Sequence, residues 1–104
     1  MWYSASLFYS GTREGEAKAS IWMETLVLIE AENEDQAKEI ASNIGKGEEH
    51  QYKTIDGAIL YWLFEKVERI QTIEDMRLKN GVELFSRFLR PEEAESLLTP
   101  FDDE

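Results

Sequence analysis

The only histidine of the 104-residue chain follows two glutamates, in the run Glu48-Glu49-His50. A carboxylate beside an imidazole raises the pKa of the ring and can make it an acid–base group. The competing interpretation is a solvated polar run on an edge strand. Because the chain holds 22 acidic residues, an acidic neighbour for the histidine is expected by chance. We therefore favour the edge strand.

Two further charged side chains stand inside apolar segments, Glu24 in residues 21–31 and Arg87 in residues 82–89. A lone buried charge is costly, whereas opposite charges on one sheet face neutralise each other. We expect an ion pair that fixes the register of the strands. The alternative is a clamp in which Arg87 and Arg90 grip a carboxylate or a phosphate.

The rest of the sequence lacks the motifs of several common types of catalytic and metal-binding site. The chain has no cysteine, which removes thiol nucleophiles and cysteine-based metal sites. The run Gly45-Lys46-Gly47 lacks the spacing of a phosphate loop. No calcium-binding loop or nucleophile elbow occurs either. The sequence therefore predicts a protein that is not an enzyme and needs no cofactor or metal.

The elements that hold these side chains begin with two strands, over residues 2–9 and 21–31. The first strand alternates apolar residues on one face, and the second is apolar on both faces, as in a central strand. A helix is expected over residues 34–44. Asn33 is a favourable N-cap for it, and Gly45 is the expected residue just after its end.

Three more strands are expected, over residues 48–54, 58–70 and 82–89. The dipeptide Asp56-Gly57 is a strong hairpin signal between the first two of them. A short acidic helix follows over residues 92–98. The order β-β-α-β-β-β-α predicts a single α+β domain with a mostly antiparallel five-stranded sheet and one helix packed on one face.

One helix covers only one face of such a sheet, so the other face is expected to carry apolar residues. Three arrangements of that face remain open. The sheet can curl and fill it, helped by Leu97, Leu98 and Phe101; a homodimer can cover it; or it can be a groove for a ligand or partner. The residues expected there are Trp2, Ser4, Ser6, Phe8, Trp22, Glu24, Leu26, Leu28, Trp62, Phe64, Glu83, Phe85 and Arg87.

The net charge of the chain makes some classes of binding partner more favourable than others. Its 22 acidic and 11 basic residues give a net charge of −11, which repels phosphate backbones and anionic lipid. We expect neither nucleic acid nor a membrane as a direct partner, and a basic protein is favoured. Without a secretory signal or a long apolar run, the sequence predicts a cytoplasmic protein.

A series of short segments carries a family resemblance. They are Trp2-Tyr3-Ser4-Ala5, Trp22-Met23-Glu24 through Leu28, residues 31–41, Glu49-His50-x-Tyr52, Gly57 with Trp62-x-Phe64, and Gly81-Val82-Glu83 with Ser86-Arg87-Phe88. Together they resemble the bacterial family of domain of unknown function DUF4288, over about residues 2–90. The resemblance implies a compact domain without an established activity. The positions it singles out are Trp2, Glu24, His50, Trp62, Glu83, Ser86 and Arg87.

The leading hypothesis for function is a non-catalytic interaction protein. Its most concrete form is an inhibitor or immunity-type protein that neutralises a basic partner such as a nuclease toxin. The second hypothesis is a small-molecule sensor or accessory domain that uses the aromatic sheet face with Arg87. The third is a hydrolase built on Glu24, Glu49 or His50. The candidate binding residues are Trp2, Trp22, Glu24, His50, Trp62, Glu83 and Arg87.

Overall fold

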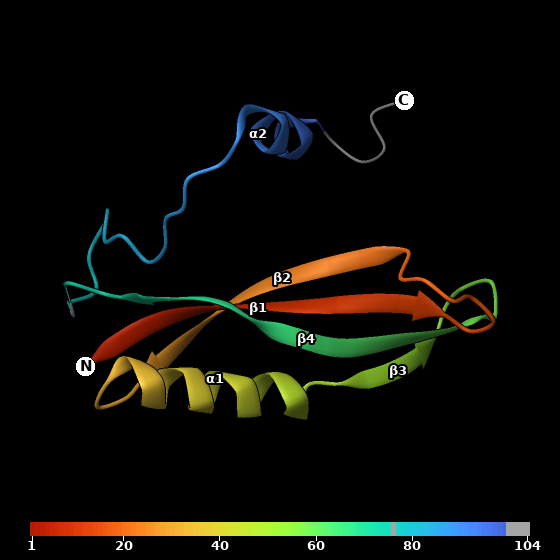
Figure 1. Ribbon diagram of the computed structural model, residues 1–104, viewed down its shortest axis with the longest axis horizontal. Coiled ribbons are helices and arrows are strands. Elements are labelled where there is room, and N and C mark those ends of the chain that lie inside the picture. The colour runs from red at the N-terminus through yellow and green to blue at the C-terminus, as the bar shows by residue number, and fades with distance from the viewer. Residues whose placement is uncertain (76, 100–104) are drawn as a thin grey trace.

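The computed structural model describes residues 1–75 and 77–99. Four antiparallel strands form one sheet in the order β2-β1-β4-β3. Helix α1 lies along one face, and α2 stands apart on the other side (Figure 1). The elements are β1 (Trp2–Arg13), β2 (Ile21–Glu30), α1 (Glu34–Gly47), β3 (His50–Lys53), β4 (Ile59–Thr72) and α2 (Pro91–Leu98). The expected α+β class with an antiparallel sheet is confirmed.

The central strand β1 and helix α1 build the core. Four buried residues alternate along β1 in this core: Tyr3, Ala5, Leu7 and Tyr9. Ala37 and Ala41 of α1 belong to the same cluster and are fully buried. Their small side chains allow the helix to lie close to the sheet. The alternation expected in the first strand therefore identifies the core correctly.

The start of α1 is confirmed, whereas its expected end is wrong. The Asn33 side chain accepts a hydrogen bond of 2.8 Å from the Gln36 N–H, as an N-cap should. The helix then continues through Gly45 to Gly47. Gly45 is buried, and a Cβ at this position would collide with the ring of Phe64. The glycine thus marks a close approach of helix and sheet.

Strands β1 and β4 also differ from expectation. β1 continues past its expected end, through Gly11 to Arg13. The Trp62 indole lies over the bare backbone of Gly11, where a Cβ would be 3.0 Å from ring carbons. Trp62 is only 8% exposed and packs with Phe64 in the core, so placing them on the uncovered face was wrong. Residues 59–64 are apolar on both sides, and alternation alone does not distinguish the faces.

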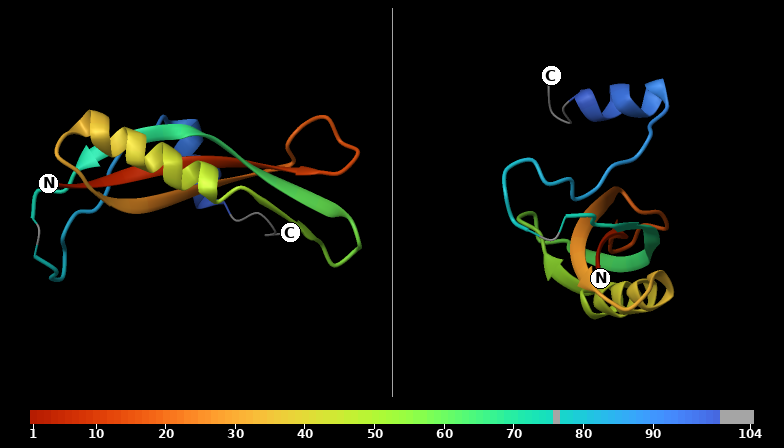
Figure 2. Two further views of the ribbon diagram at one scale, coloured as in Figure 1. Left: turned by 90° about the horizontal axis from the view of Figure 1, so that it is seen from below. Right: turned by 90° about the vertical axis from the view of Figure 1, so that its left-hand side faces the viewer.

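The fifth expected strand, over residues 82–89, does not form. This segment runs on the side of the sheet opposite α1 and joins neither edge (Figure 2). The side chain of Gln71 holds it there. Its Nε2 donates to the carbonyl of Ser86, and its Oε1 accepts from the Ser86 N–H at 3.1 Å. One side-chain amide thus takes the place of a strand partner.

Helix α2 forms as expected, but it packs against no other described helix or strand. Leu98 at its end is 82% exposed, and Leu97 is exposed as well. These leucines therefore do not fill the uncovered face of the sheet, and Phe101 lies outside the described residues. Within the described part of the chain, neither helix is long and apolar enough to cross a membrane.

The hairpin between β3 and β4 has a longer loop than the expected two residues. Thr54 and Ala58 close it through a backbone hydrogen bond of 2.7 Å, and Gly57 has a φ of +90°. A residue with positive φ at the end of such a loop favours glycine. The Asp56 carboxylate accepts hydrogen bonds from the Thr54 hydroxyl, from Arg13 at 3.0 Å and from the Ala58 N–H at 3.3 Å.

These hydrogen bonds lower the pKa of Asp56 to about 2, with the Thr54 hydroxyl as the main cause and Arg13 next. The ionised carboxylate therefore stabilises the hairpin above its unfolded pKa of 3.8, and this contribution is lost as pH falls toward 2. We expect Thr54→Val to raise the pKa of Asp56 more than Arg13→Gln does. A carboxyl NMR titration measures it, and equal midpoints in all three proteins would contradict the assignment.

Candidate functional site

The sheet face opposite α1 is the candidate site, and we call it the open face. In register, the even-numbered residues of β1 lie beside the exposed residues of β2 and β4 on this face. Leu26 and Leu28 of β2 are both large, apolar and exposed there. Figure 2 shows α1 on one side of the sheet and residues 77–99 on the other.

Three buried serines of β1 mark the middle of the open face. Ser6 Oγ donates to Glu24 Oε2 at 2.6 Å, and Ser10 Oγ donates to Glu65 Oε2 at 2.5 Å. Ser4 is as buried as Ser10, with 4% exposure. Its Oγ has no hydrogen-bond partner in residues 1–75 and 77–99. Ser4 is therefore the exception in a row of satisfied hydroxyls.

Residues 77–87, which we call the roof segment, are held over the open face by two contacts. Glu24 Oε2 accepts a hydrogen bond of 3.0 Å from Arg87 Nη1, forming an ion pair. The second contact is the Gln71–Ser86 pair described above. Within the roof segment, Ser86 Oγ donates to Glu83 at 3.1 Å. The structure thus brings together the Glu24–Arg87 pair that the sequence suggested.

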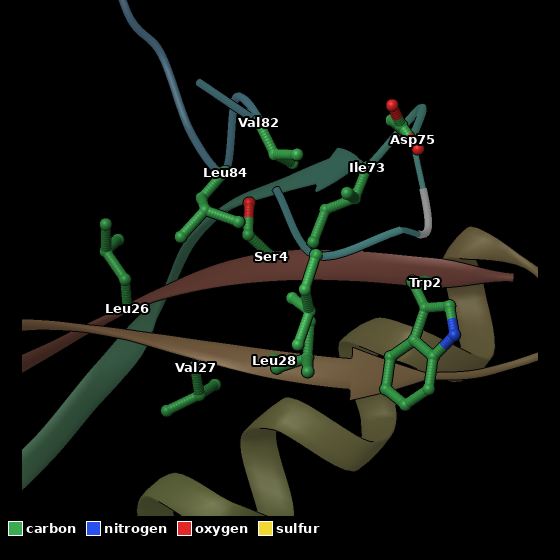
Figure 3. A pocket seen from close by; sticks show the side chains of 10 residues that line it. Trp2, Ser4, Leu26, Val27, Leu28, Ile73, Asp75, Val82 and Leu84 are labelled. Atoms are coloured by element: carbon green, nitrogen blue, oxygen red, sulfur yellow. The ribbon is translucent and has the colours of Figure 1, made fainter. Parts of the chain in front are cut away.

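A hollow of about 470 Å³ lies between the sheet and the roof segment. Figure 3 shows that the Ser4 oxygen points into it, toward Leu84. Hydrogen bonds from the Arg77 N–H and Lys79 hold the pKa of Asp75, at the margin, below its usual range, so this carboxylate stays ionised. The hollow is lined by Trp2, Ser4, Leu26, Val27, Leu28, Ile73, Asp75, Leu78, Val82 and Leu84.

At the other end of the open face, large apolar side chains are exposed and the roof segment does not cover them. Trp22 and Leu63 lie on either side of Ser10 in register, and Tyr61 lies in the next row. Trp22 is 55% exposed, Leu63 is 50% exposed, and Tyr61 is exposed too. We call these three residues the bare patch. Glu65, held by Ser10, places a carboxylate beside it.

The histidine cluster lies elsewhere, at the edge formed by β3. His50 Nδ1 is 2.8 Å from the Glu48 carbonyl, and the Glu49 carboxylate accepts from the Phe64 N–H at 2.9 Å. Glu49 thus extends the edge pairing. The nearby Tyr9 has its pKa raised by burial and by Glu48, so its hydroxyl stays neutral. In the described residues, no three metal-binding side chains gather.

Five of the seven candidate residues lie on or over the open face, and two do not. Trp62 is in the core, and His50 is at the β3 edge. Sequence reasoning missed the hollow and three of its apolar lining residues, Ile73, Leu78 and Leu84. Ile73 and Leu78 stand in a connection that is otherwise polar, and this was the available signal. The five residues on or over the open face are Trp2, Trp22, Glu24, Glu83 and Arg87.

Fold and site together define a small α+β domain with one sheet face covered by α1 and an opposite face that carries exposed apolar side chains. Comparison with family models gives the particular family. Residues 2–86 match the model of domain of unknown function DUF4288, and the chain belongs to this family. Arg87 and α2 lie beyond the matched residues. No curated protein and no solved structure matches the chain.

Proposed function

We propose that the chain is a non-catalytic binding module that recognises a basic protein through the bare patch. The observation that carries this proposal is the exposure of Trp22, Tyr61 and Leu63 on a face that α1 does not cover. Apolar patches of this kind on a small domain commonly mark interaction sites. Tryptophan and tyrosine are also prominent among residues that dominate binding energy.

The charge of the chain supports a basic partner. The net charge is −11, and the Glu65 carboxylate beside the bare patch accepts a hydrogen bond from Ser10 Oγ and pairs with no cation among residues 1–75 and 77–99. Opposite charges on the two partners accelerate their encounter and orient it. An inhibitor or immunity-type protein that neutralises a basic toxin is the most concrete form of this function.

Trp22→Ser tests the proposal. A basic protein captured from lysate with the full chain is purified and measured by surface plasmon resonance at several salt concentrations. We expect the substitution to weaken binding by roughly 30-fold or more, the effect of removing a central aromatic side chain. The association rate of the unsubstituted protein should fall as salt rises.

The control is Tyr52→Ser, because Tyr52 is also exposed but lies on β3, away from the bare patch. It should bind as the unsubstituted protein does. Equal losses in both variants would count against the bare patch, and an association rate independent of salt would count against the electrostatic part. Sedimentation that shows a stable dimer, dissociated by Trp22→Ser, would replace the proposal by self-association.

A further inference from the structure

The hollow under the roof segment is separate from the bare patch and offers a different chemistry. Its described polar groups are the Ser4 hydroxyl, the Asp75 carboxylate and the indole N–H of Trp2. Asp75 is occupied by Lys79 and Arg77. Ser4 Oγ, by contrast, is buried, points into the hollow and has no partner among the described residues. A buried hydroxyl without a hydrogen bond is costly, which points to a group that is supplied from outside the chain.

The size and walls of the hollow restrict that group to a small molecule. A volume of about 470 Å³ falls in the range of ligand sites in proteins, roughly 300–1,000 Å³. Leu28, Leu84 and Ile73 supply apolar walls from three separate parts of the chain (Figure 3). Such walls with one convergent polar group are typical of ligand sites.

Charge further narrows the class of molecule. The other two serines of the row donate their hydroxyl hydrogens to oxygen atoms, and Ser4 can do the same. An anionic ligand is disfavoured, because it would have to leave water for apolar walls and the chain has a net charge of −11. A cationic ligand would have to leave water for apolar walls, which is also costly. An uncharged oxygen acceptor satisfies both conditions.

We propose that this hollow binds a small uncharged molecule with an apolar body and a single carbonyl or hydroxyl oxygen, which accepts a hydrogen bond from Ser4 Oγ. The Glu24–Arg87 pair holds the roof segment over the site. This binding is independent of the bare patch and of any protein partner.

The test uses the full chain and a series of uncharged ketones, 2-hexanone, 2-octanone and 2-decanone, with octanoate as the anionic counterpart. Amide chemical shifts in NMR spectra report binding. We expect at least one ketone to shift the amides of Leu28 and Leu84 and octanoate to leave them unchanged. Ser4→Ala should weaken ketone binding by roughly three- to tenfold, the contribution of one neutral hydrogen bond.

Two matched variants test the location of the site. Leu84→Trp enlarges a side chain that lines the hollow and should abolish ketone binding. Leu97→Trp adds the same ring on α2, outside the lining residues and the bare patch, and should leave ketone binding unchanged. Both residues are exposed, so neither change strains the core.

Stability without ligand gives an independent readout. Because the Ser4 hydroxyl has no partner in the described part of the chain, Ser4→Ala should raise the melting temperature of the ligand-free protein. A lowered melting temperature, ketone binding that ignores Ser4→Ala, or no binding by any of the three ketones would overturn the proposal. A dimer that Leu84→Trp dissociates would also overturn it, since a second copy would then fill the hollow.

Discussion

Gly45→Ala is expected to lower the free energy of unfolding, although alanine favours helices. The new Cβ would collide with the Phe64 ring, in a part of α1 that is already buried. Overpacking of this kind costs about 1–3 kcal/mol, which exceeds the helix-propensity gain of about 0.5–1 kcal/mol. Urea unfolding at neutral pH measures the difference, and the melting temperature should fall by several degrees.

Gly47→Ala is the matched control in the same helix. A Cβ at Gly47 meets no atom within 4 Å, so only the propensity term remains and stability should stay the same or rise slightly. Phe64→Leu should absorb part of the cost of Gly45→Ala, because the clash is with the aromatic ring. If both glycine substitutions changed stability alike, the close approach of α1 to β4 would be wrong.

Gly45 also shows where sequence patterns stop being informative. The start of α1 was predictable because Asn33 and Gln36 act within one turn, and their hydrogen bond forms. A glycine near a helix end can mean termination or a close approach to another element. These two meanings differ only in what packs against the glycine, and Phe64 lies far along the chain.

The sheet face that each residue occupies and the number of strands also depend on contacts between residues far apart in the sequence. The alternation of residues 2–9 was one-sided, so the core side of β1 was predictable. The stretch 59–64 is apolar on both sides, so the position of Trp62 was decided by the space over Gly11. Residues 82–89 have the composition of a strand, but this segment pairs with neither edge of the sheet, and Gln71 instead holds it over the open face.

The part of the candidate site that contains charged side chains was predictable from the sequence. Glu24 and Arg87 were conspicuous because charges are rare in apolar segments, and the structure pairs them at 3.0 Å. No sequence feature distinguished Ser4 in this way. It has the same residue type and the same face as Ser6, and only the surroundings separate a satisfied hydroxyl from an unpaired one. Those surroundings come from β2 and the roof segment.

Glu24→Ala is expected to lower the free energy of unfolding by about 2 kcal/mol, mostly because Ser6 Oγ loses its acceptor. Ser6 has no exposed surface, and an unsatisfied buried hydroxyl costs about 1–3 kcal/mol. The ion pair with Arg87 adds less, because both side chains are 25% exposed and solvent screens them. Arg87→Ala alone should therefore cost under about 1 kcal/mol.

A double-mutant cycle separates the two contributions to Glu24. In a Ser6→Ala background no hydroxyl is left unpaired, so Glu24→Ala should lose most of its effect on the free energy of unfolding. Arg87→Ala should instead speed hydrogen exchange in the roof segment, because one of its two contacts to the sheet is gone. If the cost of Glu24→Ala persisted in the Ser6→Ala background and matched that of Arg87→Ala, the ion pair rather than the serine would be the stabilising contact. Glu24 would then stabilise the domain mainly by holding the roof segment through Arg87, and its hydrogen bond with Ser6 would contribute little.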